Sequence, residues 1–445
     1  MKIKILFWVL LFTHTLSGIA QKKEDWRSYS DIIKQNIYED YKGMYRDSGM
    51  SLPYPFLVPG SKQYGEVLWD WDSWLSNVAL RQVLMEKGSD NDKKEAVKYE
   101  QGCILNFLSH CDIDGWIPVL IDRNADLTKI KPKDIYKENM HKPCLAQHAA
   151  FLVKTNNGDV EWLRKDFHKM QYFVNNYVDH RVHAATGLAF WQTDHWIGVD
   201  NDPSTFYRPD NSSASIYLNT MLYKELEAMV YLCSQLQLNE VAAQYKKDAD
   251  KLKAAIAEHC WDERDGFYYS VDLNLRPVNN NEWFHRGAPR TYHGLIQRIG
   301  VWSGFMAMWA GIATPEQANR MVTEHFKNEK TFNATFGIRT LSKMEKMYNL
   351  KASGNPSSWQ GPIWGVSNYL TWKGLVKYGF RKEAEELAAK TIILFGKDFK
   401  SHGALHEYYE PDNGTPVLNQ GFQNWNYLVL NMLAWLEGRS VVEEF

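Results

Sequence analysis

The 445-residue sequence contains little cysteine, no excess of charge of one sign, and no long apolar run beyond its first residues. The formal net charge is −2, from 51 Lys+Arg and 53 Asp+Glu, so the chain lacks the electrostatic basis of a dedicated nucleic-acid binder or a polybasic membrane-surface protein. After the N-terminal segment, no stretch reaches the length that a transmembrane helix requires. We therefore expect no nucleic-acid partner, and no membrane partner once that segment is removed.

The few cysteines are Cys103, Cys111, Cys144, Cys233 and Cys260. An odd count in a chain of this size is not a disulfide framework, and no pair has the spacing of a zinc site. The sequence also lacks the motifs of α/β-hydrolases, P-loop proteins and zinc proteases. We expect buried free thiols, no metal and no cofactor.

Residues 1–20 are typical of a secretory signal peptide. Lys2 and Lys4 precede the apolar run Ile5–Phe12, which is too short to span a bilayer, and small residues lead to a cleavage point after Ala20. An uncleaved N-terminal anchor helix is the alternative. On the signal-peptide interpretation the protein is exported, either to the periplasm or as a secreted protein.

Apolar residues at i, i+3, i+4 spacing predict helices along the rest of the chain. The predicted helices are Asp25–Tyr45, Asp72–Glu86, Asn91–His110, Cys144–Lys154, Val160–His180, Ser213–Leu236, Glu240–His259, Val301–Gly311, Pro315–Phe326, Pro362–Tyr378, Arg381–Phe395 and Phe422–Glu437.

About twelve helices joined by short loops suit six helical hairpins closed into a ring. We predict an all-α fold, an (α/α)6 barrel of six helical hairpins with small β-hairpin insertions, the best of them at Gly266–Asp272. Residues 21–445 would form one catalytic domain, since no low-complexity or Pro/Ser-rich linker divides them. An open helical solenoid is the alternative, but it should show a sequence period, and none is found.

Aromatic residues are abundant: 14% of the chain, with 18 Trp, 24 Tyr and 20 Phe. Trp69-Asp70-Trp71-Asp72-Ser73-Trp74 places three indoles and two carboxylates within six residues. They cannot all face a core, because burying an unpaired carboxylate is costly. Carboxylates that accept hydroxyl hydrogen bonds beside indoles that stack on C–H faces are typical of sugar sites. The alternative is that Asp70 or Asp72 caps a helix.

A second acidic segment, Trp196–Ser204, contains Asp200 among apolar neighbours. Such surroundings raise the pKa of a carboxyl group, as a proton donor requires. A turn built by Asp, Asn and Pro is the alternative, and a calcium loop fails because the glycine and glutamate positions of that motif are not filled.

Two further aromatic segments are Ser358–Tyr369 and His406–Gly414, the second followed by Gly421–Trp425. Glu407 lies in the second, and a closed ring would let it face the same cavity as Asp200. Ordinary helix-start and turn chemistry is the alternative for both. A carboxylate pair among aromatic platforms indicates glycoside hydrolysis, in which one acid protonates the leaving oxygen and one base activates water.

At these residues the sequence resembles glycoside hydrolase family 63 and the trehalases. Pro59–Trp74 is similar to the trehalase signature, and Gly198-Val199-Asp200-Asn201 to a Gly-Met-Asp-Asn segment of the family. Three more segments follow in the family's order: Phe336–Ser342, Trp359–Trp364 and His406–Asp412. The resemblance runs from about Pro59 to Trp435.

The resemblance implies an (α/α)6 barrel and an inverting, exo-acting hydrolase of an α-glucosidic or α-mannosidic bond in a small oligosaccharide or glycoside. By matched position, Asp200 is the general acid and Glu407 the general base, with carboxylates about 6.5–9.5 Å apart. The implied substrate-binding residues are Trp69, Trp71, Asp72, Trp74, Gln147, Trp359, Gln360, Trp364 and Trp425.

Departures from the family pattern leave the substrate open. Gln360, Asp202 and Glu410 stand where the family has Arg, Ser and Asp, and the compact chain looks most like the mannosylglycerate and glucosylglycerate hydrolase branch. An arginine or lysine near the aglycone would favour an anionic aglycone, and the available arginines are Arg208, Arg286, Arg290 and Arg339. A polysaccharide lyase on a helical toroid and a non-catalytic carbohydrate-binding protein are the competing interpretations. The oligomeric state stays open.

Overall fold

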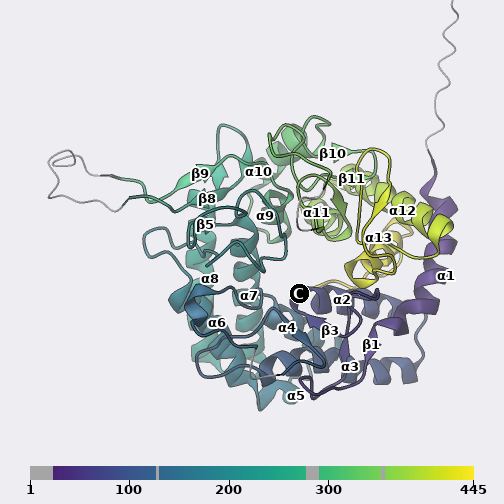
Figure 1. Ribbon diagram of the computed structural model, residues 1–445, viewed down its shortest axis with the longest axis horizontal. Coiled ribbons are helices and arrows are strands. Elements are labelled where there is room, and N and C mark those ends of the chain that lie inside the picture. Colours follow the sequence, from purple (N-terminus) through teal and green to yellow (C-terminus); the bar gives the residue numbers. More distant parts are fainter. Residues whose placement is uncertain (1–23, 127–129, 277–289, 352–355) are drawn as a thin grey trace, which may run out of the picture.

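The computed structural model describes residues 24–126, 130–276, 290–351 and 356–445 (Figure 1). The predicted signal peptide therefore lies outside the described residues. Within them, no helix combines the length and the apolar character that a membrane span needs.

The described chain is mostly helical, and every helix expected from the sequence is present. The α-helices are α1 (Ser30–Asp40), α2 (Asp70–Glu86), α3 (Asp90–Ser109), α4 (Leu145–Thr155), α5 (Glu161–Arg164), α6 (Phe167–His180), α7 (Ile216–Gln235), α8 (Asn239–His259), α9 (Met306–Trp309), α10 (Pro315–Arg320), α11 (Gly365–Lys377), α12 (Arg381–His402) and α13 (Val429–Leu436). Short 3-10 or π turns extend several of them, among them η1 (Trp26–Tyr29), η6 (Trp302–Phe305), η7 (Met321–Phe326) and η8 (Asn424–Leu428).

The helices form a closed double ring (Figure 1). Around the inner ring, α2 packs on α4, α4 on α7, α7 on α9, α9 on α11, and α11 on η8, which returns to α2. Outer helices pair with inner ones, as α8 does with α7 and α12 with α11, and α1 packs on α12 and α13. Because the two ends of the chain meet in this way, the predicted (α/α)6 barrel is confirmed.

Residue pattern explains which helices lie inside. Inner helix α4 is buried from Leu145 through Val153, because neighbours surround it on all sides. Outer helix α8 buries one stripe that includes Tyr245, Ala249 and Leu252, which is the face expected from its periodicity. Inner helix α4 therefore carries no solvent-facing stripe over these residues, and outer helix α8 does.

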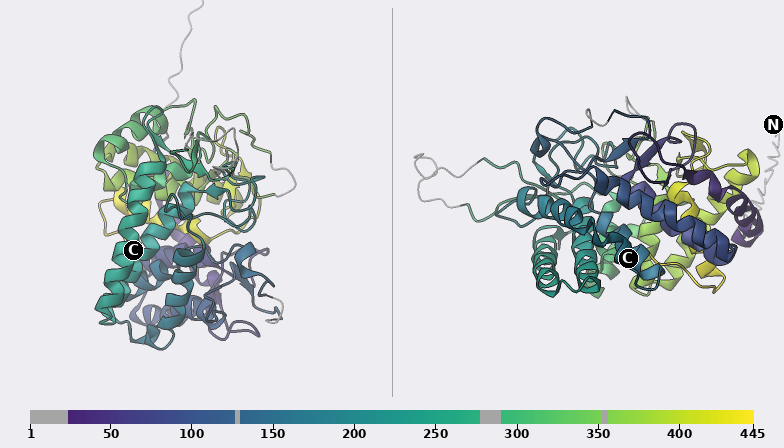
Figure 2. Two further views of the ribbon diagram at one scale, coloured as in Figure 1. Left: turned by 90° about the vertical axis from the view of Figure 1, so that its left-hand side faces the viewer. Right: turned by 90° about the horizontal axis from the view of Figure 1, so that it is seen from below.

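Strands are short and serve mainly to tie loops together. They are β1 (Tyr45–Arg46), β2 (Phe56–Leu57), β3 (Val67–Trp69), β4 (Leu120–Asp122), β5 (Ser213–Ala214), β6 (Trp261–Asp262), β7 (Phe267–Tyr268), β8 (Ser270–Asp272), β9 (Leu295–Gln297), β10 (Asn333–Ala334), β11 (Gly337–Ile338), β12 (Ile363–Trp364), β13 (Tyr408–Tyr409) and β14 (Pro416–Val417). The predicted hairpin at Gly266–Asp272 is divided: β7 pairs with β6, whereas β8 joins β5 and β9. In the left view of Figure 2, the long teal helices lie on one side of the molecule and irregular connections gather on the other.

One helix end differs from expectation. The prediction ends a helix at Phe395, but α12 continues to His402 and stops at Gly403, whose φ is +69°. Gly396 suggests an end in the sequence, yet it lies inside the helix because a Cβ there would collide with the Tyr29 side chain. The glycine thus lets α12 and η1 pack closely. The five cysteines are free and buried, as expected.

Candidate active site

A cavity of about 110 Å³ brings together segments from distant parts of the chain. Its lining residues are Tyr64, Trp69, Trp71, Asp72, Val119, Lys142, Trp196, Gly198, Asp200, Ser357, Trp359, Trp364, Glu407, Phe422 and Trp425. Both predicted catalytic carboxylates, Asp200 and Glu407, face this one cavity. Three of the indoles, those of Trp69, Trp359 and Trp425, have a buried Nε1 without a hydrogen-bond partner in the described structure, so they can donate to a ligand.

The two carboxylates of the Trp69–Trp74 segment have different roles, because Asp70 supports the backbone and Asp72 lines the cavity. Asp70 is the first residue of α2, not its cap, and accepts the backbone N–H groups of Trp71 (2.7 Å) and Lys142 (2.9 Å). The Lys142 ammonium lies 2.8 Å from the Asp70 carboxylate, and both side chains are almost fully buried. Asp70 therefore anchors the floor of the cavity, and Asp72, two residues on, faces into it.

Asp72 is a buried acid held by an asparagine in an unusual conformation. Burial raises its pKa to about 8, with the Asp70 charge adding to the effect. Asn424 donates its Nδ2 to Asp72 Oδ1 at 2.5 Å and accepts from Ser76 at 3.0 Å. The φ of Asn424 is +38°, a region that non-glycine residues seldom occupy. Such a strained residue supporting a carboxylate is typical of functional sites.

Glu407 is held by two hydrogen-bond donors. The Tyr64 hydroxyl lies 3.2 Å from each carboxylate oxygen, and the Asn419 amide donates to Oε2. Burial raises the pKa of Glu407 to about 7, the Asn419 and Tyr64 hydrogen bonds lower it, and the charge of Asp200 raises it. At neutral pH this carboxylate can therefore take up or release a proton.

A small sheet fixes the aromatic wall beside Glu407. Strands β12 and β13 pair with Trp364 opposite Tyr408, and their rings stack with centroids 5.0 Å apart. Trp359 also stacks on Trp364, at 4.1 Å and with an angle of 11° between the planes. Motifs separated by more than forty residues in the sequence thus form one continuous wall.

The Asp200 loop is tied to the same wall through its neighbour Asn201. The backbone N–H of Trp359 donates to Asn201 Oδ1 at 2.6 Å, and Gln360 Nε2 donates to the Asn201 carbonyl at 3.2 Å. Asp202 is buried and accepts the Ser204 N–H at 2.8 Å, so it builds the turn. Burial raises the pKa of Asp202 to about 6.

Three predicted binding residues do not line the cavity. Trp74 points away from it and packs against Trp309 in the core. Gln147 is fully buried and donates to the carbonyls of Pro143 and Met221. Gln360 holds the Asn201 backbone from behind the wall. We correct these expectations. Trp74 and Gln147 lie on the inner helices α2 and α4, where residues near a cavity residue in sequence can face the surrounding helices instead. Gln360 lies just before β12, in the segment behind the wall.

Residues that the sequence reasoning did not select also line the cavity. Tyr64 lies within the Pro59–Trp74 segment, and Lys142 lies just before the predicted helix Cys144–Lys154. In the sequence, neither a tyrosine nor a lysine carries a signal that separates a site residue from a structural one. Trp196 is 52% exposed and has a φ of +60°, which only a structure shows. Phe422 precedes Trp425 and completes the aromatic rim.

A histidine cluster lies directly behind Glu407. Asp398 accepts from Nδ1 of His402 (2.8 Å) and His406 (3.0 Å), from the Tyr409 hydroxyl (2.8 Å), and from the His406 backbone N–H (3.0 Å). Its geometry would admit a cation, but these hydrogen bonds already satisfy the Asp398 carboxylate. We interpret the cluster as the anchor of the turn that carries Glu407.

The Tyr64 hydrogen bond has a testable effect on pH dependence. Tyr64→Phe removes a donor that lowers the pKa of Glu407, so the pKa rises. Because a general base works only when ionised, the acid limb of the kcat/KM profile moves to higher pH. The pH profile of sugar release measures this shift, with exposed Tyr207→Phe as the control. An unmoved or lowered limb would contradict the assignment of that limb to Glu407.

Residues 65–426 match the model of the mannosylglycerate hydrolase MGH1-like glycoside hydrolase domain. The chain belongs to this family. Its predicted resemblance to glycoside hydrolase family 63 and the trehalases is thereby confirmed, and the match includes Asp200, Glu407 and every aromatic residue of the wall.

Relatives of this MGH1-like chain include fungal trehalases. The cytosolic neutral trehalase of Kluyveromyces lactis is 26% identical over 257 residues, which is 55% of this chain and 31% of that protein. The probable trehalase of Eremothecium gossypii is 30% identical over 226 residues, 47% of this chain and 28% of that protein. The matched regions thus span about a third of the relatives' length.

A solved structure supports the fold of the MGH1-like chain. The GH63 mannosylglycerate hydrolase of Thermus thermophilus, in complex with glucose, covers 92% of this chain and 99% of its own, with a TM-score of 0.63 and 17% sequence identity. Agreement over nearly the whole of both chains at this identity establishes a shared architecture.

One prediction is wrong by these comparisons. The sequence led us to expect an exported protein, whereas curated relatives of the chain, including the one from Kluyveromyces lactis, are named cytosolic neutral trehalases. The expected periplasmic or secreted location is corrected accordingly. Composition of an N-terminal segment does not by itself fix the compartment in which a protein works.

Proposed function

We propose that the chain is an inverting, exo-acting glycoside hydrolase that cleaves the α-glucosidic or α-mannosidic bond of a small oligosaccharide or glycoside. The observation that carries the proposal is the meeting of Asp200 and Glu407 in one aromatic cavity. Asp200 protonates the leaving oxygen, and Glu407 removes a proton from the attacking water. The family membership and the trehalase relatives support the same chemistry.

The Glu407 environment suits a base. Its pKa of about 7 leaves it substantially ionised at neutral pH, and a base with a pKa near the working pH is the most effective. Tyr64 and Asn419 hold the carboxylate in one orientation. Removal of the water's proton therefore requires no movement of the base.

The cavity suits a terminal sugar ring. At its inner end, Trp71 is 2% exposed and packs on Trp425 and Tyr217 with ring centroids 4.9 and 5.6 Å away. Because this end is closed, the chain of the substrate can extend only outward. Asp72 and the unpartnered indole N–H groups provide acceptors and donors for sugar hydroxyls.

Product stereochemistry tests the proposal. The purified protein is incubated with α-linked glucose disaccharides and with α-mannosides, and the released sugar is followed by proton NMR. We expect the β-anomer to appear first, because inversion of an α-bond gives a β-product. First appearance of the α-anomer would refute inversion, and an unsaturated product absorbing in the ultraviolet would indicate a lyase instead.

A further inference from the structure

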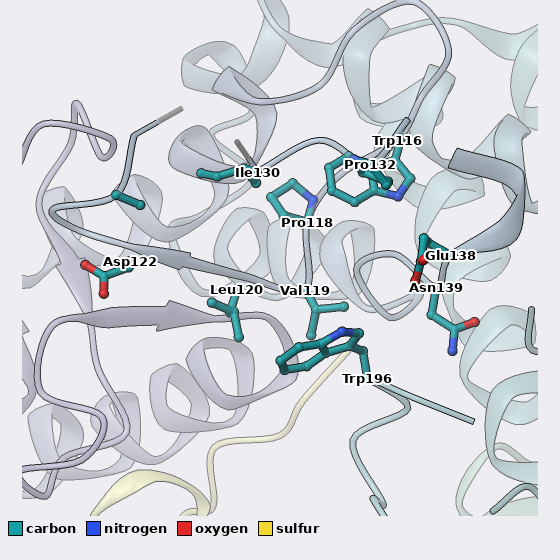
Figure 3. Close-up of a pocket in the computed structure, with 11 residues that line it drawn as sticks. Trp116, Pro118, Val119, Leu120, Asp122, Ile130, Pro132, Glu138, Asn139 and Trp196 are labelled. Carbon is teal, nitrogen blue, oxygen red and sulfur yellow. The ribbon is translucent and has the colours of Figure 1, made fainter. Parts of the chain in front are cut away.

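A second hollow continues from the mouth of the active-site cavity. It has a volume of about 320 Å³ and shares Val119 and Trp196 with that cavity. In Figure 3, the Trp196 indole lies against Val119 and Leu120, while Pro118, Pro132 and Trp116 form the opposite side. We call this hollow the outer cleft. Since the inner end of the site is closed, the outer cleft offers a path outward for a substrate longer than two rings.

Trp196 lies where the active-site cavity meets the outer cleft, and its backbone has an unfavourable conformation. Its φ is +60°, and such left-handed non-glycine residues carry strain that persists only where the surroundings impose it. Asn139 imposes it: its amide donates to the carbonyls of Thr193 (3.0 Å) and His195, directly before Trp196, and its oxygen accepts from Gln192 at 2.9 Å. The exposed indole is therefore held as a fixed platform between the two hollows.

The polar groups that line the outer cleft are complementary to a neutral ligand with hydroxyl groups. The Trp116 indole N–H is buried and has no partner in the described structure, so it needs an acceptor. Among the described residues, no hydrogen bond or ion pair engages the Glu138 carboxylate, so it can accept from a donor. Asp122 adds a second negative charge to the lining. A hydroxyl both donates and accepts, whereas an anion would be repelled by both carboxylates.

The described lining of the two hollows offers no unpaired lysine or arginine to bind an anionic aglycone. No lysine or arginine lines the described part of the outer cleft, and the one cation of the inner cavity's described lining, Lys142, is paired with Asp70. Arg208 pairs with Asp272, and Arg339 pairs with Asp412 at 2.8 Å. Arg290 donates to a backbone carbonyl at 2.7 Å, and Arg286 lies outside the described residues. None of the described arginines therefore lines the outer cleft or the inner cavity, where it could bind a glycerate carboxylate.

From these observations we infer that the aglycone is a neutral sugar chain of two or more rings, which stacks on Trp196 and continues along the outer cleft. The inference rests on the proposed function, and it narrows the substrate class to uncharged oligosaccharides. It separates this chain from hydrolases of glycosylglycerates, whose aglycone carries a carboxylate.

Chain-length dependence tests the inference. The best reducing α-linked glucose disaccharide is compared with the trisaccharide that adds one glucose at its reducing end, and with α-glucosylglycerate, by the rate of glucose release. We expect kcat/KM for the trisaccharide to exceed that for the disaccharide by about tenfold, equivalent to about 1.4 kcal/mol, and glucosylglycerate to be the poorest substrate. Equal values for the two oligosaccharides, or a preference for glucosylglycerate, would overturn the inference.

A matched pair of variants assigns the effect to the platform. Trp196→Ala should bring the ratio of trisaccharide to disaccharide kcat/KM close to one. Tyr207→Ala should leave the ratio unchanged, because Tyr207 has the same φ of +60° and is 83% exposed but lines neither hollow. A ratio that survives Trp196→Ala, or is lost equally in both variants, would contradict the assignment.

Binding separates this inference from the proposed function. If no substrate releases sugar, the proposed function fails, and calorimetry with the same disaccharide and trisaccharide then decides the inference alone. Tighter binding of the trisaccharide, lost in Trp196→Ala, supports the outer cleft as a sugar site. Equal binding of the two oligosaccharides overturns it.

Discussion

Asp200→Asn and Glu407→Gln should each lower hydrolysis of an α-glucoside by about 10²–10⁴-fold, the range that positioned acids and bases contribute. The two carboxylates face one cavity from segments more than two hundred residues apart, so each change removes one of the two proton transfers. Steady-state glucose release measures the loss, and calorimetry of a disaccharide shows that the variants still bind. Activity within about tenfold of the unchanged protein would exclude the corresponding role.

A substrate that needs no acid distinguishes the two roles. Fluoride leaves α-glucosyl fluoride without prior protonation, so Asp200→Asn should hydrolyse it at a rate close to that of the unchanged protein. Glu407→Gln should stay inactive on it, because attack by water still needs the base. The reverse pattern would exchange the assignments, and loss of fluoride hydrolysis in both variants would show that Asp200 is not simply the proton donor.

Periodicity allowed most of the fold to be predicted. The stripe on α8 is such a local signal, and the structure shows another at the start of α10, the Thr314 capping box, in which the Gln317 N–H donates to the Thr314 hydroxyl at 3.2 Å. The end of α12 was missed because Gly396 is dictated by a distant contact with Tyr29. In these helices, local signals mark where a helix begins. The end of α12 depends instead on packing against a distant residue, which the sequence pattern does not show.

The residues that line the cavity were harder to predict from the sequence than the helices. Clustered Trp and Asp located Asp72 and Trp71, but the same cluster also suggested Trp74, which faces the core. Sequence spacing does not reveal which side of an inner helix meets the cavity, since nearly all sides of a helix such as α2 are buried and polar residues occur on more than one of them. Trp196 was missed for the opposite reason: its importance lies in its exposure and its left-handed backbone.

The buried ion pair beneath the site gives the largest expected change in stability. Lys142→Met leaves the Asp70 carboxylate without its cation in a fully buried position, since the side chains of Lys142 and Asp70 are 1% and 0% exposed. Loss of one partner from such a pair costs about 3–5 kcal/mol, because the remaining charge stays desolvated. Urea unfolding followed by circular dichroism measures the free energy of unfolding.

Two comparisons show that burial is the cause. Lys246→Met breaks an exposed pair with Asp250, whose side chains are 55% and 59% exposed, and should change the free energy of unfolding by less than about 1 kcal/mol. Asp70→Asn combined with Lys142→Met removes both charges, so it should recover part of the loss, although Asp70 also accepts two backbone N–H groups. A double variant less stable than Lys142→Met alone would show that those backbone contacts, and not the ion pair, hold the floor of the cavity. Because Lys142 also lowers the pKa of Asp72, its removal should keep Asp72 protonated to higher pH, so stability and sugar binding depend on the same buried charge.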